Sequence, residues 1–118
     1  MKIFVLEDEF ERIKWFKSVF SDCEIDITDK VAEACEYLQK KQYDWIFLDR
    51  DLSHPTETGE DVAWEMKEQK LNKNAAVIIH TMNTRGQRVM LRYIKEYNSN
   101  VSQVDFRNLM KTQRKDFD

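Results

Sequence analysis

The sequence predicts an α/β domain built on a doubly wound, five-stranded parallel sheet, the flavodoxin-like architecture, with helices on both faces. Short apolar runs alternate with longer amphipathic segments along all 118 residues, as in repeated β–α units. Residues 45–48 and 75–79 are wholly apolar, which is typical of strands buried on both faces. No linker or change of composition divides the chain, so we expect a single domain over residues 1–118.

Composition narrows the class of protein further. Apolar residues make up 42% of the chain and charged residues 35%, which predicts a globular protein. No apolar run has the length of a membrane span, and the first one stops at Glu7, so we expect a cytoplasmic protein. The formal charge of −3 argues against bulk binding of nucleic acid. Cys23 and Cys35 lack CxxC spacing and are interpreted as reduced thiols.

The first half of the chain supplies three strands and two helices. We expect strands at residues 2–6, 23–27 and 45–48, and the alternation in the second of them suits a strand near the sheet edge. Apolar residues at intervals of three and four predict helices over 9–20 and 31–40. The buried face of the first helix is predicted to hold Phe10, Ile13, Phe16 and Phe20.

The second half repeats this alternation. The sequence Thr58-Gly-Glu-Asp61 has the spacing of a capping box and predicts a helix start. After the strand at 75–79, a helix is expected from about Thr84, and then a weak strand at 101–106. The last helix is predicted to be short, and the polar stretch 111–118 is expected to fray.

Acidic residues follow two of the predicted strands where each strand ends. The carboxyl ends of strands in such sheets form the edge at which ligands bind. Carboxylates collected there repel one another unless a proton or a cation lies between them, and Mg²⁺ (or Mn²⁺) prefers such oxygen ligands. The candidate metal ligands are Asp8, Glu7, Glu9, Asp49 and Asp51. The alternative is that these residues are solvated acids of surface loops.

Other residues near this edge suit phosphate chemistry. His80 ends the fourth strand beside the carboxylates, whose negative charge is expected to raise its pKa and to keep it available as a general acid. The alternative is a histidine that only forms a hydrogen bond at a strand end. Candidate phosphate ligands are Thr81, Asn83, Arg50, Arg85 and Arg88. The alternatives are a helix-capping role for Asn83 and a solvated helix face for Arg85 and Arg88.

The order of these parts resembles the receiver domain of bacterial response regulators. The likeness rests on the acids after the first strand, Leu48-Asp49, Gly59 and Thr81. It implies that Asp49 is a phosphoacceptor, that Asp8 with Glu7 or Glu9 binds Mg²⁺, and that the Thr81 hydroxyl contacts the phosphoryl group. The chain departs from receivers after the fifth strand, where Val104-Asp-Phe-Arg107 lacks their Lys-Pro pair.

A second resemblance is to the cyclic-phosphate processing receiver domains. It rests on Leu48-Asp-Arg-Asp-Leu52, on Gly59 with Asp61-Val62, and on Ile79-His-Thr-Met-Asn83 followed by Gly86 and Met90. Arg50 and Thr81 replace a His and a Ser of that pattern. Thr81 keeps a hydroxyl, whereas Arg50 exchanges a titratable imidazole for a permanent cation.

Three hypotheses of function follow from the sequence. The first is a metal-dependent phosphoesterase that binds a phosphorylated small molecule, such as a cyclic-phosphate nucleotide or an RNA end, with Asp49 and His80 as the catalytic residues. The second is a single-domain response regulator in which Asp49 accepts a phosphoryl group from a phosphodonor. The phosphorylated protein then signals to a partner protein. The third is a non-catalytic pseudo-receiver that binds a partner protein or a nucleotide.

Overall fold

The computed structural model describes residues 1–118 and contains one parallel sheet with the strand order β2-β1-β3-β4-β5. The strands are β1 (Lys2–Leu6), β2 (Glu24–Thr28), β3 (Trp45–Leu48), β4 (Ala76–Ile79) and β5 (Val101–Gln103). The helices are α1 (Phe10–Val19), α2 (Val31–Lys40), α3 (Gly59–Gln69), α4 (Thr84–Lys95) and α5 (Phe106–Leu109), and a 3₁₀ turn, η1, spans Arg114–Phe117. The predicted fold class is confirmed, and so are the short last helix and the place of β2 at the sheet edge.

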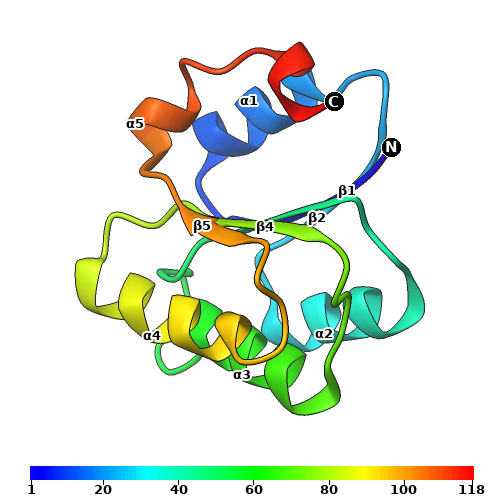
Figure 1. The fold of residues 1–118 in the computed structure, drawn as a ribbon. Coiled ribbons are helices and arrows are strands. Elements are labelled where there is room, and N and C mark those ends of the chain that lie inside the picture. The colour runs from blue at the N-terminus through cyan, green and yellow to red at the C-terminus, as the bar shows by residue number, and fades with distance from the viewer.

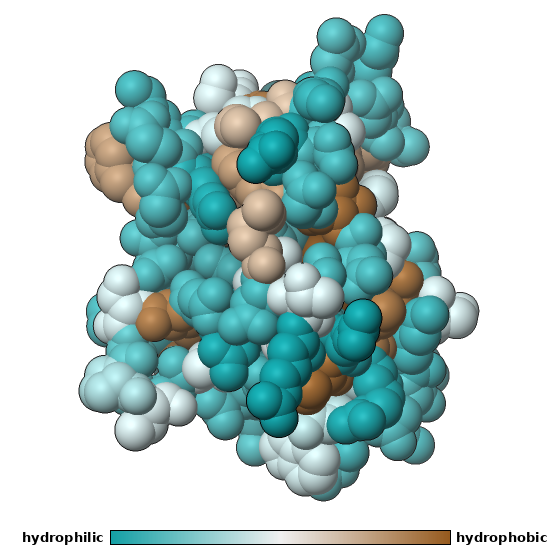
Figure 2. All heavy atoms as spheres, turned by 90° about the vertical axis from the view of Figure 1, so that its left-hand side faces the viewer, coloured by the Kyte–Doolittle hydropathy of each residue, from teal (hydrophilic) through white to brown (hydrophobic).

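Helices cover both faces of the sheet and bury two separate cores (Figure 1). The face covered by α2, α3 and α4 holds a core of 17 buried residues, mostly aliphatic. The opposite face, covered by α1 and α5, holds nine, five of which are phenylalanines packed ring against ring: Phe16, Phe20, Phe47, Phe106 and Phe117. Figure 2 shows the side of the molecule that carries α5 and α4, which is mainly hydrophilic with a band of apolar side chains in its upper half. None of the helices has the length and apolar character that a membrane crossing requires.

The predicted buried face of α1 is wrong at its first residue. Phe10 is 73% exposed, whereas Phe16 and Phe20 are fully buried. Six residues at 100° per residue place Phe10 about 120° around the helix from Phe16, so the two side chains leave the helix on different sides. Intervals of three or four residues place each apolar residue near the next one around the helix, but the small angular offsets add up, so the first and later members of the set lie on different sides.

The expected fraying of residues 111–118 is also wrong for Phe117. Its side chain is 4% exposed, its ring packs on Phe20 and Trp45 at centroid distances of 5.1 Å, and its carbonyl oxygen accepts a 2.9 Å hydrogen bond from the Trp45 indole. A single aromatic residue within a polar stretch therefore anchors the end of the chain to the sheet.

Two helix starts position the ends of β3 and β4. The predicted capping box at the start of α3 is present, with Thr58 and Asp61 each bonded to the other's backbone. A Cβ atom on Gly59 would lie 1.9 Å from the carbonyl oxygen of Asp49, so only glycine lets α3 approach the end of β3 this closely. Asn83 caps α4 by accepting a 2.9 Å hydrogen bond from the Gly86 amide.

Candidate metal and phosphate site

Glu7, Asp49 and His80 meet at the carboxyl end of the sheet. The strand register pairs Leu6 with Leu48 and Leu48 with Ile79, so the next residue of each strand stands side by side with the others. One ligand atom from each of the three side chains lies within 4.8 Å of the others, and all three side chains are buried. Three neighbouring parallel strands thus deliver two carboxylates and an imidazole to one point.

The Glu7 carboxylate is fully buried and is held by several donors. Its Oε2 atom accepts 3.1 Å hydrogen bonds from the amides of Asp8 and Glu9, and its Oε1 atom lies 2.8 Å from His80 Nε2. Burial raises the pKa of Glu7 above its usual value, and these backbone donors offset part of that rise. The carboxylate that faces His80 is therefore fixed in orientation.

Asp49 is also buried, with only 4% of its surface exposed. Its Oδ1 atom accepts a 2.8 Å hydrogen bond from the Arg50 amide. Burial, followed by the negative charge of Glu7, raises the pKa of Asp49 to about 6. At neutral pH Asp49 is ionised at a cost in free energy, as expected of a carboxylate placed to receive a cation.

The expected rise in the pKa of His80 is wrong. Burial lowers the pKa to about 4, because the loss of solvation of the imidazolium outweighs the attraction of Asp49. A neutral His80 that donates from Nε2 to Glu7 carries no proton on Nδ1, and this buried Nδ1 has no hydrogen-bond partner. The ring packs against Phe16 and Phe106, so at neutral pH the structure presents a neutral imidazole that orients Glu7.

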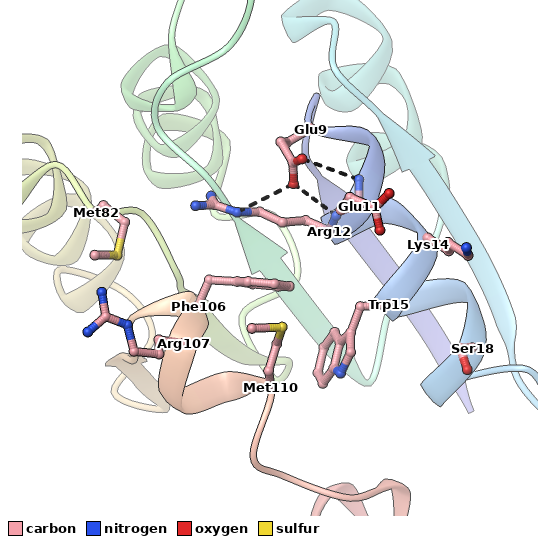
Figure 3. A pocket seen from close by; sticks show the side chains of 10 residues that line it. All are labelled: Glu9, Glu11, Arg12, Lys14, Trp15, Ser18, Met82, Phe106, Arg107 and Met110. Atoms are coloured by element: carbon pink, nitrogen blue, oxygen red, sulfur yellow. Dashed lines mark hydrogen bonds and ion pairs between the residues drawn. The ribbon is translucent and has the colours of Figure 1, made fainter.

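Arg12 is a member of the site that the sequence interpretation missed. Its Nη1 atom lies 3.8 Å from both Glu7 Oε1 and Asp49 Oδ2, and its guanidinium lies over the Phe106 ring, 5.0 Å from the centroid. Figure 3 shows it reaching from α1 past Glu9, to which it is also paired. The available signal was its position four residues before the buried Phe16, which places Arg12 on the inner face of the first helical turn.

A cleft with a volume of about 220 Å³ lies beside the cluster of Glu7, Asp49 and His80, and four of the remaining candidates line it. Asp8 Oδ2 accepts a 2.5 Å hydrogen bond from the Ser53 hydroxyl, and Glu9 caps α1 through the amides of Glu11 and Arg12. Thr81 is almost wholly buried, and its Oγ1 atom accepts a 3.1 Å hydrogen bond from the Asn83 amide. The cleft-lining candidates outside the buried cluster are Asp8, Glu9, Asp51 and Thr81.

The Arg50 side chain lies outside this cleft. Its Nε atom is 2.6 Å from Glu60 Oε2 and its Nη1 atom is 2.8 Å from Asp51 Oδ1, so two carboxylates already neutralise it. Its methylene groups lie against Gly86, where an added Cβ atom would come within 2.4 Å of the Arg50 side chain. The arginine therefore joins the starts of α3 and α4, and its predicted phosphate contact stays a prediction.

The other predicted phosphate ligands are also outside the cleft lining. Asn83 caps α4, its expected alternative role, and its Nδ2 atom lies 3.5 Å from Asp51 Oδ1. Arg85 and Arg88 are exposed on α4, as the solvated-face interpretation expects. Their phosphate contacts, and that of Asn83, stay predictions.

The residues present fit a divalent cation. Glu7 and Asp49 offer carboxylate oxygens at one point, and Asp8 lines the cleft beside them. Three carboxylates form an oxygen donor set that suits Mg²⁺ or Mn²⁺. Arg12 places a positive charge beside two of these carboxylates. The site therefore has the negative charge that a metal cation requires, and the Arg12 guanidinium balances part of that charge.

Comparisons with solved structures agree with the fold. TrrA of Thermotoga maritima, a response regulator in complex with Mg²⁺–BeF, shows 23% identity and a TM-score of 0.67 over 98% of this chain and 97% of its own. The phosphorylated cyanobacterial phytochrome response regulator RcpA shows 19% identity and a TM-score of 0.71 over 98% of this chain and 87% of its own. The receiver domain of a Pseudomonas aeruginosa sensor histidine kinase, with magnesium coordinated in its active-site cleft, shows 17% identity and a TM-score of 0.69 over 98% of this chain and 88% of its own.

A search of curated proteins gives no significant match. The family model described as the cyclic-phosphate processing receiver domain matches residues 1–96, which include all the residues of the buried cluster and its cleft. The chain therefore belongs to the cyclic-phosphate processing receiver domain family, and it has the fold of response-regulator receiver domains.

Proposed function

We propose that this protein binds a divalent metal ion and a phosphorylated ligand, a cyclic-phosphate nucleotide or an RNA end, in the acidic cleft and hydrolyses its cyclic phosphodiester. In this step water attacks the phosphorus, one ring P–O bond breaks, and the freed ribose oxygen takes up a proton. The observation that carries the proposal is the convergence of Glu7, Asp49 and His80 within 4.8 Å at the carboxyl end of the sheet. Membership of a family described as cyclic-phosphate processing supports the ligand class.

Each residue of the cleft has a role in this proposal. Glu7, Asp8 and Asp49 would hold the ion, which when bound would polarise the phosphoryl group. The Thr81 hydroxyl, whose oxygen already accepts from the Asn83 amide, has its proton free to donate to a phosphate oxygen. His80, neutral and bonded to Glu7, keeps that carboxylate in place.

The test is turnover of nucleoside 2′,3′-cyclic and 3′,5′-cyclic phosphates with Mg²⁺ or Mn²⁺, followed by ³¹P NMR. We expect ring opening by the wild type and a loss of at least about 100-fold in Asp49→Asn. Asp44→Asn is the matched control, because Asp44 is exposed and accepts from the Lys2 amide at the other end of the sheet. Absence of turnover with every substrate would remove the catalytic part of the proposal, and binding without turnover would favour a non-catalytic pseudo-receiver.

A second candidate function is phosphotransfer to Asp49. It is favoured by the receiver fold, which places Asp49 at the end of β3 and Thr81 at the end of β4, lining one cleft. Against it, the segment Val104-Asp-Phe-Arg107 after β5 lacks the Lys-Pro pair of receivers, although Arg12 brings a cation to Asp49 from α1. Measurement of the intact protein mass after incubation with acetyl phosphate tests this function. Phosphotransfer requires the mass of one added phosphoryl group in the wild type and no such addition in Asp49→Asn.

A further inference from the structure

A hollow of about 600 Å³ lies between α1 and α5 and has no part in the chemistry proposed above. Figure 3 shows Trp15 on one side of it, Phe106 and Met110 at its centre, and Met82 and Arg107 on the other side. The hollow follows from the length of α5, which has only four residues and so leaves most of α1 uncovered on this side.

The hollow adjoins the acidic cleft. Glu9, Arg12 and Met82 line both of them, so these three side chains stand between the two spaces. A ligand whose phosphate lies beside Asp49 reaches the space between α1 and α5 past these side chains. The two spaces together are longer than a phosphate group or a metal ion requires.

The side chains around the hollow suit a flat organic ring that carries phosphate. Met82 and Met110 are 55% and 50% exposed at its rim, which is unusual for methionine and provides a flexible, polarisable surface for an aromatic group. Together with Trp15 and Phe106 they supply the apolar part of the lining. This apolar surface has no covering element of the chain.

The hollow also carries positive charge that the protein leaves unpaired. Lys14 and Arg107 line it, both are exposed, and neither forms an ion pair with a carboxylate. Glu11 is the one carboxylate of the lining without an ion pair, so the unpaired side chains carry a net positive charge. This charge beside an apolar lining complements a nucleotide, whose base is apolar on its faces and whose phosphates are anionic.

We infer that the hollow between α1 and α5 binds the nucleoside part of the phosphorylated ligand, with the base against Met82, Met110 and Trp15. The inference rests on the proposed function, because the cleft must hold the cyclic phosphate of the same molecule. It narrows the ligand from any cyclic phosphate to a nucleotide or an RNA 3′ end. Arg107, on the Met82 side of the hollow (Figure 3), then faces the phosphate on the 5′ side, which an RNA end has and a nucleoside cyclic phosphate lacks.

The test uses the full chain labelled with ¹³C at the methionine methyl groups and titrated with Mg²⁺ and three ligands: glycerol 1,2-cyclic phosphate, adenosine 2′,3′-cyclic phosphate and a dinucleotide ending in a 2′,3′-cyclic phosphate. We expect the two nucleotide ligands to shift the Met82 and Met110 signals, while Met66 and Met90, both fully buried, stay unchanged. The base should lower the Kd at least tenfold relative to the glycerol compound. A further decrease with the dinucleotide indicates an RNA end, and equal values indicate a free nucleotide.

Variants at Met110 separate this inference from the proposed function. Met110→Glu is expected to raise the Kd of the nucleotides about tenfold and to leave that of glycerol 1,2-cyclic phosphate unchanged, whereas Met110→Leu retains wild-type affinity. Equal affinity for all three ligands, or nucleotide binding that Met110→Glu does not alter, would overturn the inference and leave the proposed function standing. If none of the ligands binds, the inference falls, and the proposed function fails for five-membered cyclic phosphates.

Discussion

At the scale of single residues, the site brings together an acid and a base whose pKa values are shifted in opposite directions. Asp49 has a raised pKa because it is buried beside Glu7, and His80 has a lowered pKa because it is buried altogether. Arg12 contributes the only permanent positive charge within 4 Å of the two carboxylates. The stability of the metal-free protein is therefore expected to depend on each of these residues.

Asp49→Asn is expected to stabilise the metal-free protein at pH 7. Burial raises the pKa of Asp49 from 3.8 to about 6, so the ionised form costs on the order of 3 kcal/mol, and asparagine avoids that cost while still accepting from the Arg50 amide. Urea unfolding in EDTA should show a gain of about 1–3 kcal/mol. Stability equal to or below that of the wild type would show that the carboxylate is not under this strain.

The same variant should reveal how His80 titrates. Its pKa in the folded protein, about 4, lies below the unfolded value of 6.5, so its contribution to stability is complete above pH 6.5 and is lost as the pH falls toward 4. In the wild type Asp49 opposes this, because its raised pKa removes stability as the pH rises from 3.8 to about 6. We expect a shallow pH dependence between pH 4 and 6 in the wild type and a clear loss of stability toward low pH in Asp49→Asn.

Unfolding curves at half-unit pH steps give this comparison, with Asp44→Asn as the control. Identical pH profiles for Asp49→Asn and the wild type would contradict the raised pKa of Asp49. A profile of Asp49→Asn that shows no loss of stability toward low pH would contradict the assignment of His80 as neutral in the folded protein.

Arg12→Met removes the internal cation and keeps much of the side chain that packs on Phe106. With two carboxylates left uncompensated, the metal-free variant should lose about 1–2 kcal/mol, a value discounted because Arg12 is a quarter exposed. It should also bind Mn²⁺ several-fold more tightly than the wild type by calorimetry, since no cation competes for the carboxylates. Lys17→Met, an exposed change on the same helix, should alter neither quantity.

At the scale of elements, the site depends on two glycines in the first turns of helices. Gly59 lets α3 pack against the end of β3, and Gly86 lets α4 pack against the Arg50 side chain. Gly59→Ala would push a Cβ atom to 1.9 Å from the Asp49 carbonyl oxygen, so α3 or the end of β3 has to move. Gly86→Ala meets the Arg50 side chain, which is flexible and can shift, although its contact with Glu60 would then weaken.

We therefore expect Gly59→Ala to cost about 2–3 kcal/mol or more and Gly86→Ala about 1 kcal/mol or less, as measured by urea unfolding. Equal losses in the two variants would show that the backbone contact at the end of β3 is no more restrictive than the contact with a side chain.

At the scale of the whole molecule, the second core is completed by residues that follow the part of the chain matched by the family model. Phe117 packs on Phe20, which follows the last residue of α1, and on Trp45 and Phe47 of β3. This core also backs the site, because Phe16 and Phe106 of the same cluster contact the His80 ring. The aromatic core and the buried imidazole therefore form one continuous packed region.

Phe117→Ala is expected to reduce the free energy of unfolding by about 3–4 kcal/mol, since it empties a buried site among large aromatic rings. Lys115→Ala, an exposed change in the same turn, should cost less than about 0.5 kcal/mol in the same urea experiment. A small loss in Phe117→Ala would show that the end of the chain does not contribute to this core.

Much of the fold could be predicted from the sequence because its signals are local. Apolar runs of four and five residues, helical spacing between them, and acids directly after the runs predicted the sheet, its helices and the edge at which Glu7 and Asp49 meet. The missed features depend on distance through space. Phe117 stands in a polar stretch, Phe10 falls in the helical spacing but on the wrong side of α1, and Arg12 enters the site from a helix rather than from a strand end.

By itself, the sequence determined the α/β class, the short last helix, the family resemblance, and that carboxylates and a histidine gather at one edge of the sheet. Only the tertiary structure decided that Glu7 turns inward to bond His80, that Asp8 turns out to Ser53, and that His80 is neutral. The physical reason is that a side chain's type and spacing follow from the sequence, whereas its solvation and its charged neighbours follow from packing. Here burial outweighs the attraction of nearby carboxylates, and that balance sets the pKa of His80.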